Sequence, residues 1–204
     1  MPQYVLGHYL KGEGKRLALM SELLDPMHRR YIDALNIVRP GARTLEVGCG
    51  NASISAWLAE RVSPGGTAVA FDLDLSLIEV RAPNLELRQG DIVAGPVAPG
   101  TFDLVTARAV LHHVADAEVA ITNLVASLRT GGVLLLIEPD FLPVSIAEPP
   151  EVRAFWQGVA GVVARTRDRL PHRAHSGATT RSARFDSNKR HRGDGHLQRR
   201  LDMG

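Results

Sequence analysis

The sequence predicts an α/β fold with a doubly wound, mostly parallel β-sheet. Strand-length apolar segments alternate with amphipathic helical segments along most of the chain. The fifth apolar segment is continuous, which is typical of a parallel strand covered on both faces. A glycine-rich turn joins the first strand directly to a helix, so the backbone there can approach a ligand closely. The five recognisable strands are residues 44–47, 67–71, 85–89, 102–106 and 133–137.

Composition limits the classes of protein to which the chain can belong. Its 204 residues are 45% apolar, enough for one domain with a real core. No apolar run approaches the roughly 20 residues of a membrane helix, and the N-terminus has no signal-peptide apolar region. We therefore expect no membrane contact. The single cysteine, Cys49, excludes an intrachain disulfide framework and is typical of a reducing compartment, which predicts a cytoplasmic location.

The chain divides into three predicted parts: an N-terminal helical segment at residues 1–40, a core at residues 41–170, and a tail at residues 171–204. The tail holds eight Lys/Arg and three Asp, so the rest of the chain is at −3 although the formal net charge is +2. An acidic body argues against nucleic-acid binding. A nucleic-acid-binding tail is an alternative, but its one aromatic residue, Phe185, is too little for base stacking.

The N-terminal segment predicts two helices. Asp25 and Pro26 would begin the second helix, as its N-cap and its first-turn proline. These helices either pack against the sheet or form a lid over a ligand, with Tyr4 and His8 as candidate contacts. The sequence leaves both interpretations open.

An acid stands inside the first strand, directly before the glycine turn. This acid is Glu46, and Ser53 occupies the place of the third glycine of a dinucleotide-binding turn. A carboxylate here would repel a pyrophosphate and would suit an ammonium or sulfonium group. Both features disfavour a nicotinamide-dependent dehydrogenase, the competing class of enzyme.

Acids also follow the second and third strands. Asp72 is placed to accept two hydrogen bonds from a ribose diol. Asp91 could accept from an adenine amino group while Ile92 packs on the ring, or it could be an ordinary turn residue. Asp74 is better explained as the N-cap of a short helix.

The fourth strand leads into Ala107 and Arg108. A helix at residues 116–128 follows, and the glycines at residues 131–132 would end it. Because the carboxyl ends of parallel strands meet at one edge, the four polar strand ends predict a ligand crevice where the strand order reverses.

Five segments together resemble the class I S-adenosylmethionine-dependent methyltransferases, from Tyr4 to about Val163. The resemblance implies a Rossmann-like fold, S-adenosylmethionine as methyl donor, a small-molecule acceptor and no metal. It names neither the acceptor nor an oligomeric state. The segments are LEVGCGNAS, AFDLD, APNLELRQGDI, FDLVTARAVLHHV and GGVLLLIEPDF. The implied cofactor contacts are Glu46, Gly48, Cys49, Gly50, Asn51, Asp72, Leu73, Asp91, Ile92, Ala107 and Arg108.

A methyl transfer of this kind demands few reactive residues, because the cofactor supplies the chemistry and the protein supplies orientation. A general base matters only for an acceptor that must first lose a proton. His112 and His113 are the candidates, and we favour His113 as catalytic; backbone bonding is the alternative. Glu138 and Asp140 would line the acceptor pocket, cap a helix or lie on the surface.

The C-terminal end departs from the family pattern. A helix at residues 151–167 would cover the acceptor side of the crevice, but apolar periodicity stops near residue 170, so the tail is predicted to be disordered. The family usually continues with a helix and two strands, and the sequence lacks this C-terminal strand pair. We expect an aberrant C-terminus, as a shifted reading frame would give. The alternative function is a truncated, non-catalytic remnant that at most binds the cofactor.

Overall fold

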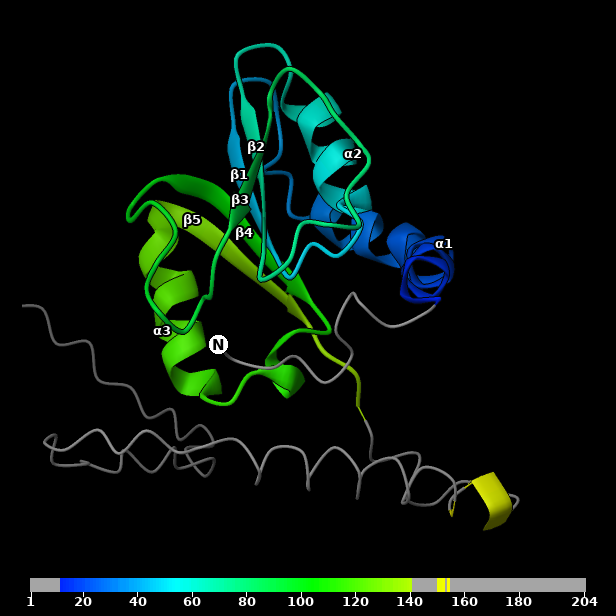
Figure 1. The fold of residues 1–204 in the computed structure, drawn as a ribbon. Coiled ribbons are helices and arrows are strands. Elements are labelled where there is room, and N and C mark those ends of the chain that lie inside the picture. The colour runs from blue at the N-terminus through cyan, green and yellow to red at the C-terminus, as the bar shows by residue number, and fades with distance from the viewer. Residues whose placement is uncertain (1–11, 141–149, 153, 155–204) are drawn as a thin grey trace, which may run out of the picture. The chain divides into compact units, whose positions relative to one another are not determined.

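The computed structural model describes residues 12–140, 150–152 and 154 (Figure 1). All of them belong to the first of two compact units, Met1–Leu170, and the second unit is Pro171–Gly204. The predictions for Tyr4, His8, the tail and most of the helix at residues 151–167 lie outside the described residues. The predicted boundaries of the three parts stay predictions.

A single sheet of five parallel strands lies at the centre of the described residues, in the order β3-β2-β1-β4-β5 (Figure 1). The strand order reverses between β1 and β4. This confirms the predicted doubly wound parallel sheet, and four of the five strands lie within two residues of their predicted bounds. The strands are β1 (Arg43–Val47), β2 (Thr67–Asp72), β3 (Leu85–Gln89), β4 (Phe102–Arg108) and β5 (Leu128–Ile137).

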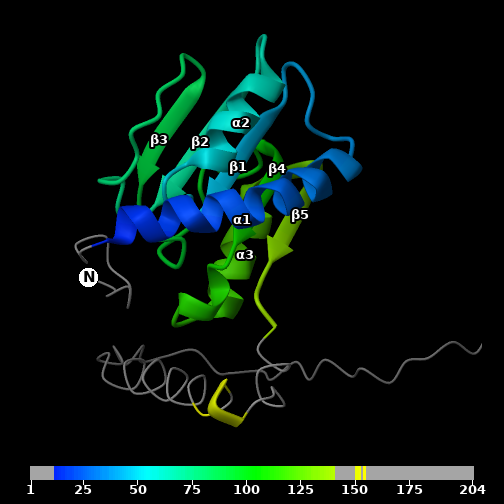
Figure 2. The ribbon, with the colours of Figure 1, turned by 90° about the vertical axis from the view of Figure 1, so that its right-hand side faces the viewer.

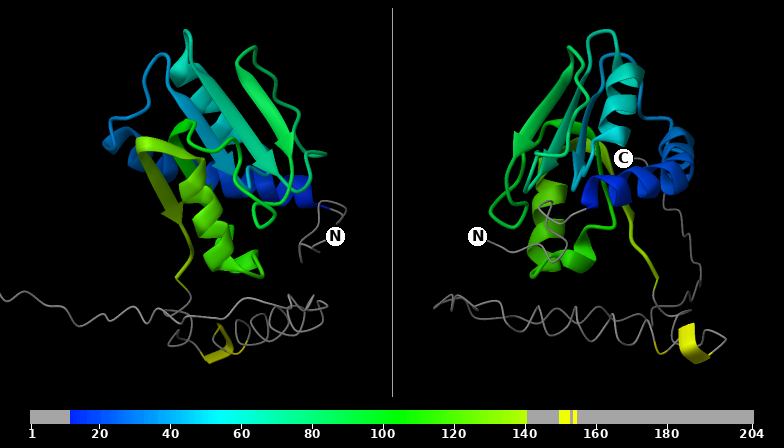
Figure 3. Two further views of the ribbon diagram at one scale, coloured as in Figure 1. Left: turned by 90° about the vertical axis from the view of Figure 1, so that its left-hand side faces the viewer. Right: turned by 45° about the vertical axis from the view of Figure 1, so that its right-hand side comes forward.

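Helices cover both faces of this sheet. The helix α3 (Ala117–Ser127) packs on one face, and α1 (Glu13–Ala34) and α2 (Ser53–Val62) pack on the other (Figures 1 and 3). Side chains along β1 alternate between these faces, so Leu45 joins the core under α3 while Glu46 points to the side of α2. A short 3-10 helix, η1 (Leu111–His113), follows β4.

The N-terminal segment forms one helix, so the predicted start of a second helix at Asp25 is wrong. Pro26 lies inside α1, where its missing N–H and its ring cost about 3 kcal/mol. Tertiary contacts offset that cost: Asp25 is 5% exposed and pairs with Arg108, and His28 is fully buried. Figure 2 shows α1 running across the strands near their carboxyl ends. The buried face of α1 therefore continues past the proline.

The predicted short helix after Asp74 is also wrong, because this segment is a turn. The Asp74 carboxylate accepts from the backbone N–H of Ser76 at 2.8 Å. Such a local side-chain bond competes with helix formation. By contrast, α3 is confirmed close to its predicted bounds, and Asp116 caps it by accepting from the Val119 N–H at 3.0 Å.

Two predictions for the region around β5 need correction. The helix ends at Ser127, and the glycines at residues 131–132 lie inside β5, where its pairing with β4 shifts register. A Cβ on Gly132 would lie 2.6 Å from the Phe102 carbonyl oxygen, so this close approach requires glycine. The predicted burial on both faces is wrong as well. Residues 133–137 are half-buried, and β5 is an edge strand among the described residues.

Every helix within the described ranges is too short or too polar to cross a bilayer.

Candidate functional site

The turn between β1 and α2 depends on glycine. Gly48 and Gly50 have φ angles of 68° and 56°, in the left-handed region that favours glycine, and Ala52 follows at 60°. A Cβ on Gly48 would clash with the Cγ2 of Val110, from the loop after β4. The turn therefore leaves its backbone uncovered, as the sequence predicted.

The acid at the end of β2 is joined to this turn. Asp72 Oδ2 accepts from the Gly50 N–H at 2.9 Å, and its Oδ1 accepts from the Leu73 N–H at 2.7 Å. The Phe71 carbonyl accepts from Gly48 N–H at 2.8 Å. The first two predicted strand ends are therefore in direct contact.

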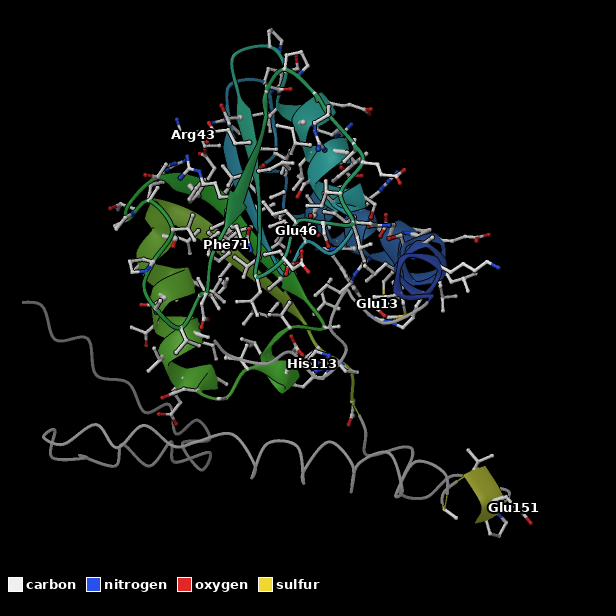
Figure 4. The ribbon with its side chains drawn as sticks, viewed as in Figure 1. Glu13, Arg43, Glu46, Phe71, His113 and Glu151 are labelled. Carbon is white, nitrogen blue, oxygen red and sulfur yellow. The ribbon has the colours of Figure 1, made fainter. Side chains whose placement is uncertain are left out.

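Glu46 is a buried acid, 4% exposed, on the side of β1 that faces α2 (Figure 4). Its Oε2 accepts from the backbone N–H of Ser55 at 2.8 Å and from the Ser55 hydroxyl. Burial raises the pKa of Glu46 to about 7, although the Ser55 hydrogen bonds and the Arg108 charge oppose that rise. A cation nearby would favour the ionised carboxylate.

The predicted site residue Arg108, at the end of β4, pairs with α1. Its guanidinium lies 2.8 Å from Asp25 Oδ1, with the two side chains 14% and 8% exposed, and Arg29 approaches the same carboxylate at 3.6 Å. One turn along α1, His28 Nε2 lies 2.8 Å from Thr106 Oγ1, which itself donates to the carbonyl of Leu135. These contacts fasten α1 to β4.

The helix α1 also lies on the glycine turn. A Cβ on Gly50 would lie 3.3 Å from Leu17 Cδ2. The Ser21 hydroxyl donates to Asn51 Oδ1 at 3.1 Å, and the Ser53 hydroxyl donates to Ser21 at 3.0 Å. Of the two open interpretations, packing on the sheet is present here. The same contacts place α1 over the predicted methionine end of the site.

The end of β3 lies beside that of β2, because the Gly90 N–H donates to the Asp72 carbonyl at 2.9 Å. Asp91 accepts from the Val93 N–H at 2.9 Å, which is the geometry of an ordinary turn residue. Ile92 is 5% exposed and packs in the core cluster under α3. Leu73 is 37% exposed.

Beyond the buried Ala107, the candidate histidines lie on η1 (Figure 4 labels His113). Burial and the neighbouring His112 lower the pKa of His113 to about 4, although Glu138 opposes this. Their ring centroids are 3.8 Å apart. His112 Nδ1 lies 2.7 Å from Glu138 Oε2. His113 is therefore neutral and only weakly basic at neutral pH.

Cys49 is 5% exposed, and burial raises the pKa of its thiol far above the usual range. It packs as a small side chain in the turn, as expected. No group of three or more His, Cys, Asp or Glu side chains in residues 12–140 is arranged to hold a metal ion.

Residues 45–136 match a family described as a methyltransferase domain. The chain carries a methyltransferase domain of the class I fold. Solved structures agree in fold. A SAM-dependent methyltransferase from Aquifex aeolicus has a TM-score of 0.56 at 18% identity, over 78% of this chain and 88% of that one. A TehB-like SAM-dependent methyltransferase from Corynebacterium glutamicum has a TM-score of 0.50 at 22% identity, over 62% and 73%. The methyl donor of these proteins is S-adenosylmethionine.

Curated relatives match the same part of the methyltransferase domain. Nocamycin O-methyltransferase of Saccharothrix syringae is 32% identical over 146 residues, which are 67% of this chain and 49% of that protein. The ubiquinone/menaquinone biosynthesis C-methyltransferase UbiE of Stenotrophomonas maltophilia is 29% identical over 149 residues, 67% of this chain and 59% of that protein. The chain spans about half the length of these relatives.

Sequence reasoning missed the side chains that hold the methyltransferase site together. They are Leu17 and Ser21 on α1, Ser55 on α2, and Val110 after β4. None has a distinctive motif, because an apolar side chain or a serine on a helix has many equally good uses. Only the fold brings them to the strand ends.

Proposed function

We propose that this methyltransferase domain binds S-adenosylmethionine at the carboxyl ends of β1, β2, β3 and β4 and transfers its methyl group to a small-molecule acceptor. The observation that carries the proposal is the contact between the glycine turn and the next strand. Asp72 at the end of β2 accepts from the Gly50 N–H, two residues after Gly48 and four after the buried Glu46. The family match supports the same donor.

Each strand end has a role in the proposed site. Glu46 would favour the positive charge of the donor, and Asp72 would accept from its ribose hydroxyls, since a carboxylate accepts up to about four hydrogen bonds. Asp91 and Ile92 would contact the adenine. The backbone of Gly48, Cys49, Gly50 and Asn51 would lie against the methionine end, with Leu73 beside the ribose and with Ala107 and Arg108 closing the other side.

The donor, when bound, supplies a methyl group made electrophilic by its sulfonium. The residues of this chain supply orientation, which could lower the barrier by roughly 7–11 kcal/mol when the acceptor is held in line. The α1 helix would keep water from the donor, because Leu17 and Ser21 lie on the glycine turn. His113 is the proposed base for acceptors that must lose a proton, and its pKa of about 4 makes it a weak one.

The acceptor is proposed to be a small organic molecule. The names of two relatives, an O-methyltransferase of nocamycin and a C-methyltransferase of quinone biosynthesis, support this class without choosing between oxygen and carbon. A cytoplasmic location stays a prediction from the single cysteine, Cys49.

A second candidate is the remnant that binds the cofactor without turnover. One observation favours it: β5 is a half-buried edge strand among the described residues, and natural sheets avoid long apolar edges. Turnover separates the two candidates. Transfer of a labelled methyl group to any member of a broad acceptor panel would exclude the remnant.

Calorimetric titration with S-adenosylhomocysteine tests donor binding itself. The wild-type chain should bind it, and Asp72→Ala combined with Glu46→Ala should abolish detectable binding. NADH fluorescence titration is the matched negative control, because it reports the disfavoured dehydrogenase. Unchanged affinity in the double variant would overturn the proposed site.

A further inference from the structure

One carboxylate outside the proposed donor contacts holds the loop after β4. Glu138 follows β5, and its Oε1 accepts from the backbone N–H groups of Val110 and Leu111, both at 2.9 Å. Its Oε2 lies 3.4 Å from the His112 backbone nitrogen, which donates to it, and 2.7 Å from the ring Nδ1. A single side chain therefore engages three consecutive backbone donors and one ring.

The loop needs such a partner. Ala109 has φ 56°, in the left-handed region that side chains rarely adopt, and its N–H donates to the Ile137 carbonyl at 2.8 Å. The first N–H groups of η1 have no partner within that short helix. Glu138 supplies acceptors for them from the neighbouring strand end, so it offsets the cost of this conformation.

The held loop forms a wall of the glycine turn. The three atoms nearest to a Cβ built on Gly48 all belong to the Val110 side chain, with Cβ and Cγ1 at 3.4 Å. Val110 N–H is one of the donors that Glu138 accepts. Glu138 is thereby connected to the glycine turn through one residue.

We propose that Glu138 is a positioning residue of the donor site, which acts by holding Val110 against Gly48. This inference rests on the proposed function, because the turn matters only if the donor binds there. The pKa of Glu138 is consistent with it. Burial raises that pKa, but the hydrogen bonds from His112, Leu111 and Val110 outweigh burial and lower it overall. The carboxylate is therefore ionised at neutral pH and is a full acceptor.

Calorimetry with S-adenosylhomocysteine on the full chain tests the role. Glu138→Ala should weaken binding about tenfold or more, since hydrogen bonds to a charged group are worth about 1.5–3 kcal/mol each. Glu138→Gln keeps the size but offers one acceptor oxygen, so its loss should be intermediate. Glu86→Gln is the matched control, because Glu86 pairs with Arg88 on the distant edge strand β3. It should bind like the wild type.

A double-mutant cycle distinguishes positioning through Val110 from a general loss of structure. Val110→Ala should weaken binding by itself, and adding Glu138→Ala to it should weaken binding little further. Amide hydrogen exchange at residues 110 and 111 should speed up in Glu138→Ala. Additive losses in affinity would contradict the route through Val110.

The outcomes separate the two proposals. A wild-type chain that fails to bind S-adenosylhomocysteine would overturn the proposed function and this role with it. Wild-type binding with an unchanged dissociation constant in Glu138→Ala would overturn the role of Glu138 alone. If Glu138→Ala fails to fold, Glu138→Gln decides, because its affinity must then fall relative to the Glu86→Gln control.

Discussion

Two loops border the proposed donor site, and they are held by different means. The glycine turn after β1 is held by its neighbours in the sheet: Gly48 and Cys49 donate to the Phe71 carbonyl at 2.8 and 3.3 Å, and Gly50 donates to Asp72. The loop after β4 is held by one side chain, Glu138, from the strand beside it. The first loop depends on backbone conformation, and the second depends on a carboxylate.

This difference predicts different responses to mutation. A turn that requires glycine has no room for an added methyl group, so a single substitution should disable it. A loop held by several hydrogen bonds should loosen by degrees as acceptors are removed. The four predictions that follow test this contrast, from the largest expected effect to the smallest.

Gly48→Ala should have the largest effect. The added Cβ would clash with Val110 Cγ2, and the φ of 68° disfavours any side chain. We expect the affinity for S-adenosylhomocysteine to fall at least about a hundredfold, which corresponds to about 2.8 kcal/mol. Gly95→Ala is the control, since no atom lies within 4 Å of its Cβ position. Equal affinities of the two variants would contradict the crowded turn.

Asp25→Asn should destabilise the fold that covers the glycine turn. It removes the charge that pairs with Arg108 in a poorly exposed position, and breaking such a buried pair costs about 3 kcal/mol. Chemical denaturation followed by circular dichroism measures the free energy of unfolding. Glu22→Gln, an exposed acid on the same helix, should change it by less than about 0.5 kcal/mol. A loss no larger than that in Asp25→Asn would mean that the pair contributes nothing.

Asp72→Asn should reduce donor affinity about tenfold, because the amide loses one of the two acceptor oxygens that bind Gly50 and Leu73. Calorimetry with S-adenosylhomocysteine measures this change. The control is Asp103→Asn, at the opposite end of the sheet, where the carboxylate accepts from the Arg43 N–H. If both variants bind equally well, the β2 end does not contact the donor.

Glu46 should couple stability and donor binding to pH. Its pKa is raised from 4.5 to about 7, so its contribution is present below pH 4.5 and is lost as pH rises through about 7. Glu46→Gln should flatten this decline in the free energy of unfolding. The exposed Glu60→Gln should leave it unchanged.

Donor binding should also release part of a proton from Glu46 near pH 7, because a positive ligand favours the carboxylate. Titration with S-adenosylmethionine in buffers of different ionisation enthalpy measures that release. A binding heat that is independent of the buffer would show that Glu46 does not respond to the ligand charge.

The same contrast explains which features the sequence could predict. The glycine turn, Asp72 and the strand at residues 85–89 were predicted because their signals are local: alternating side chains, glycines and an acid at a strand end. Asp25 was interpreted as a helix cap, since its partner Arg108 lies 83 residues away. The clasp of Glu138 on Val110 crosses 28 residues. Contacts of this kind become visible only when neighbouring strands are placed.

The most direct test of the account is a crystal structure of the chain with S-adenosylhomocysteine. The account predicts the ribose hydroxyls on the Asp72 carboxylate, the amino acid end against Gly48 and Gly50, and the adenine beside Asp91. A ligand bound elsewhere, or one that reaches neither Asp72 nor the glycine turn, would contradict it.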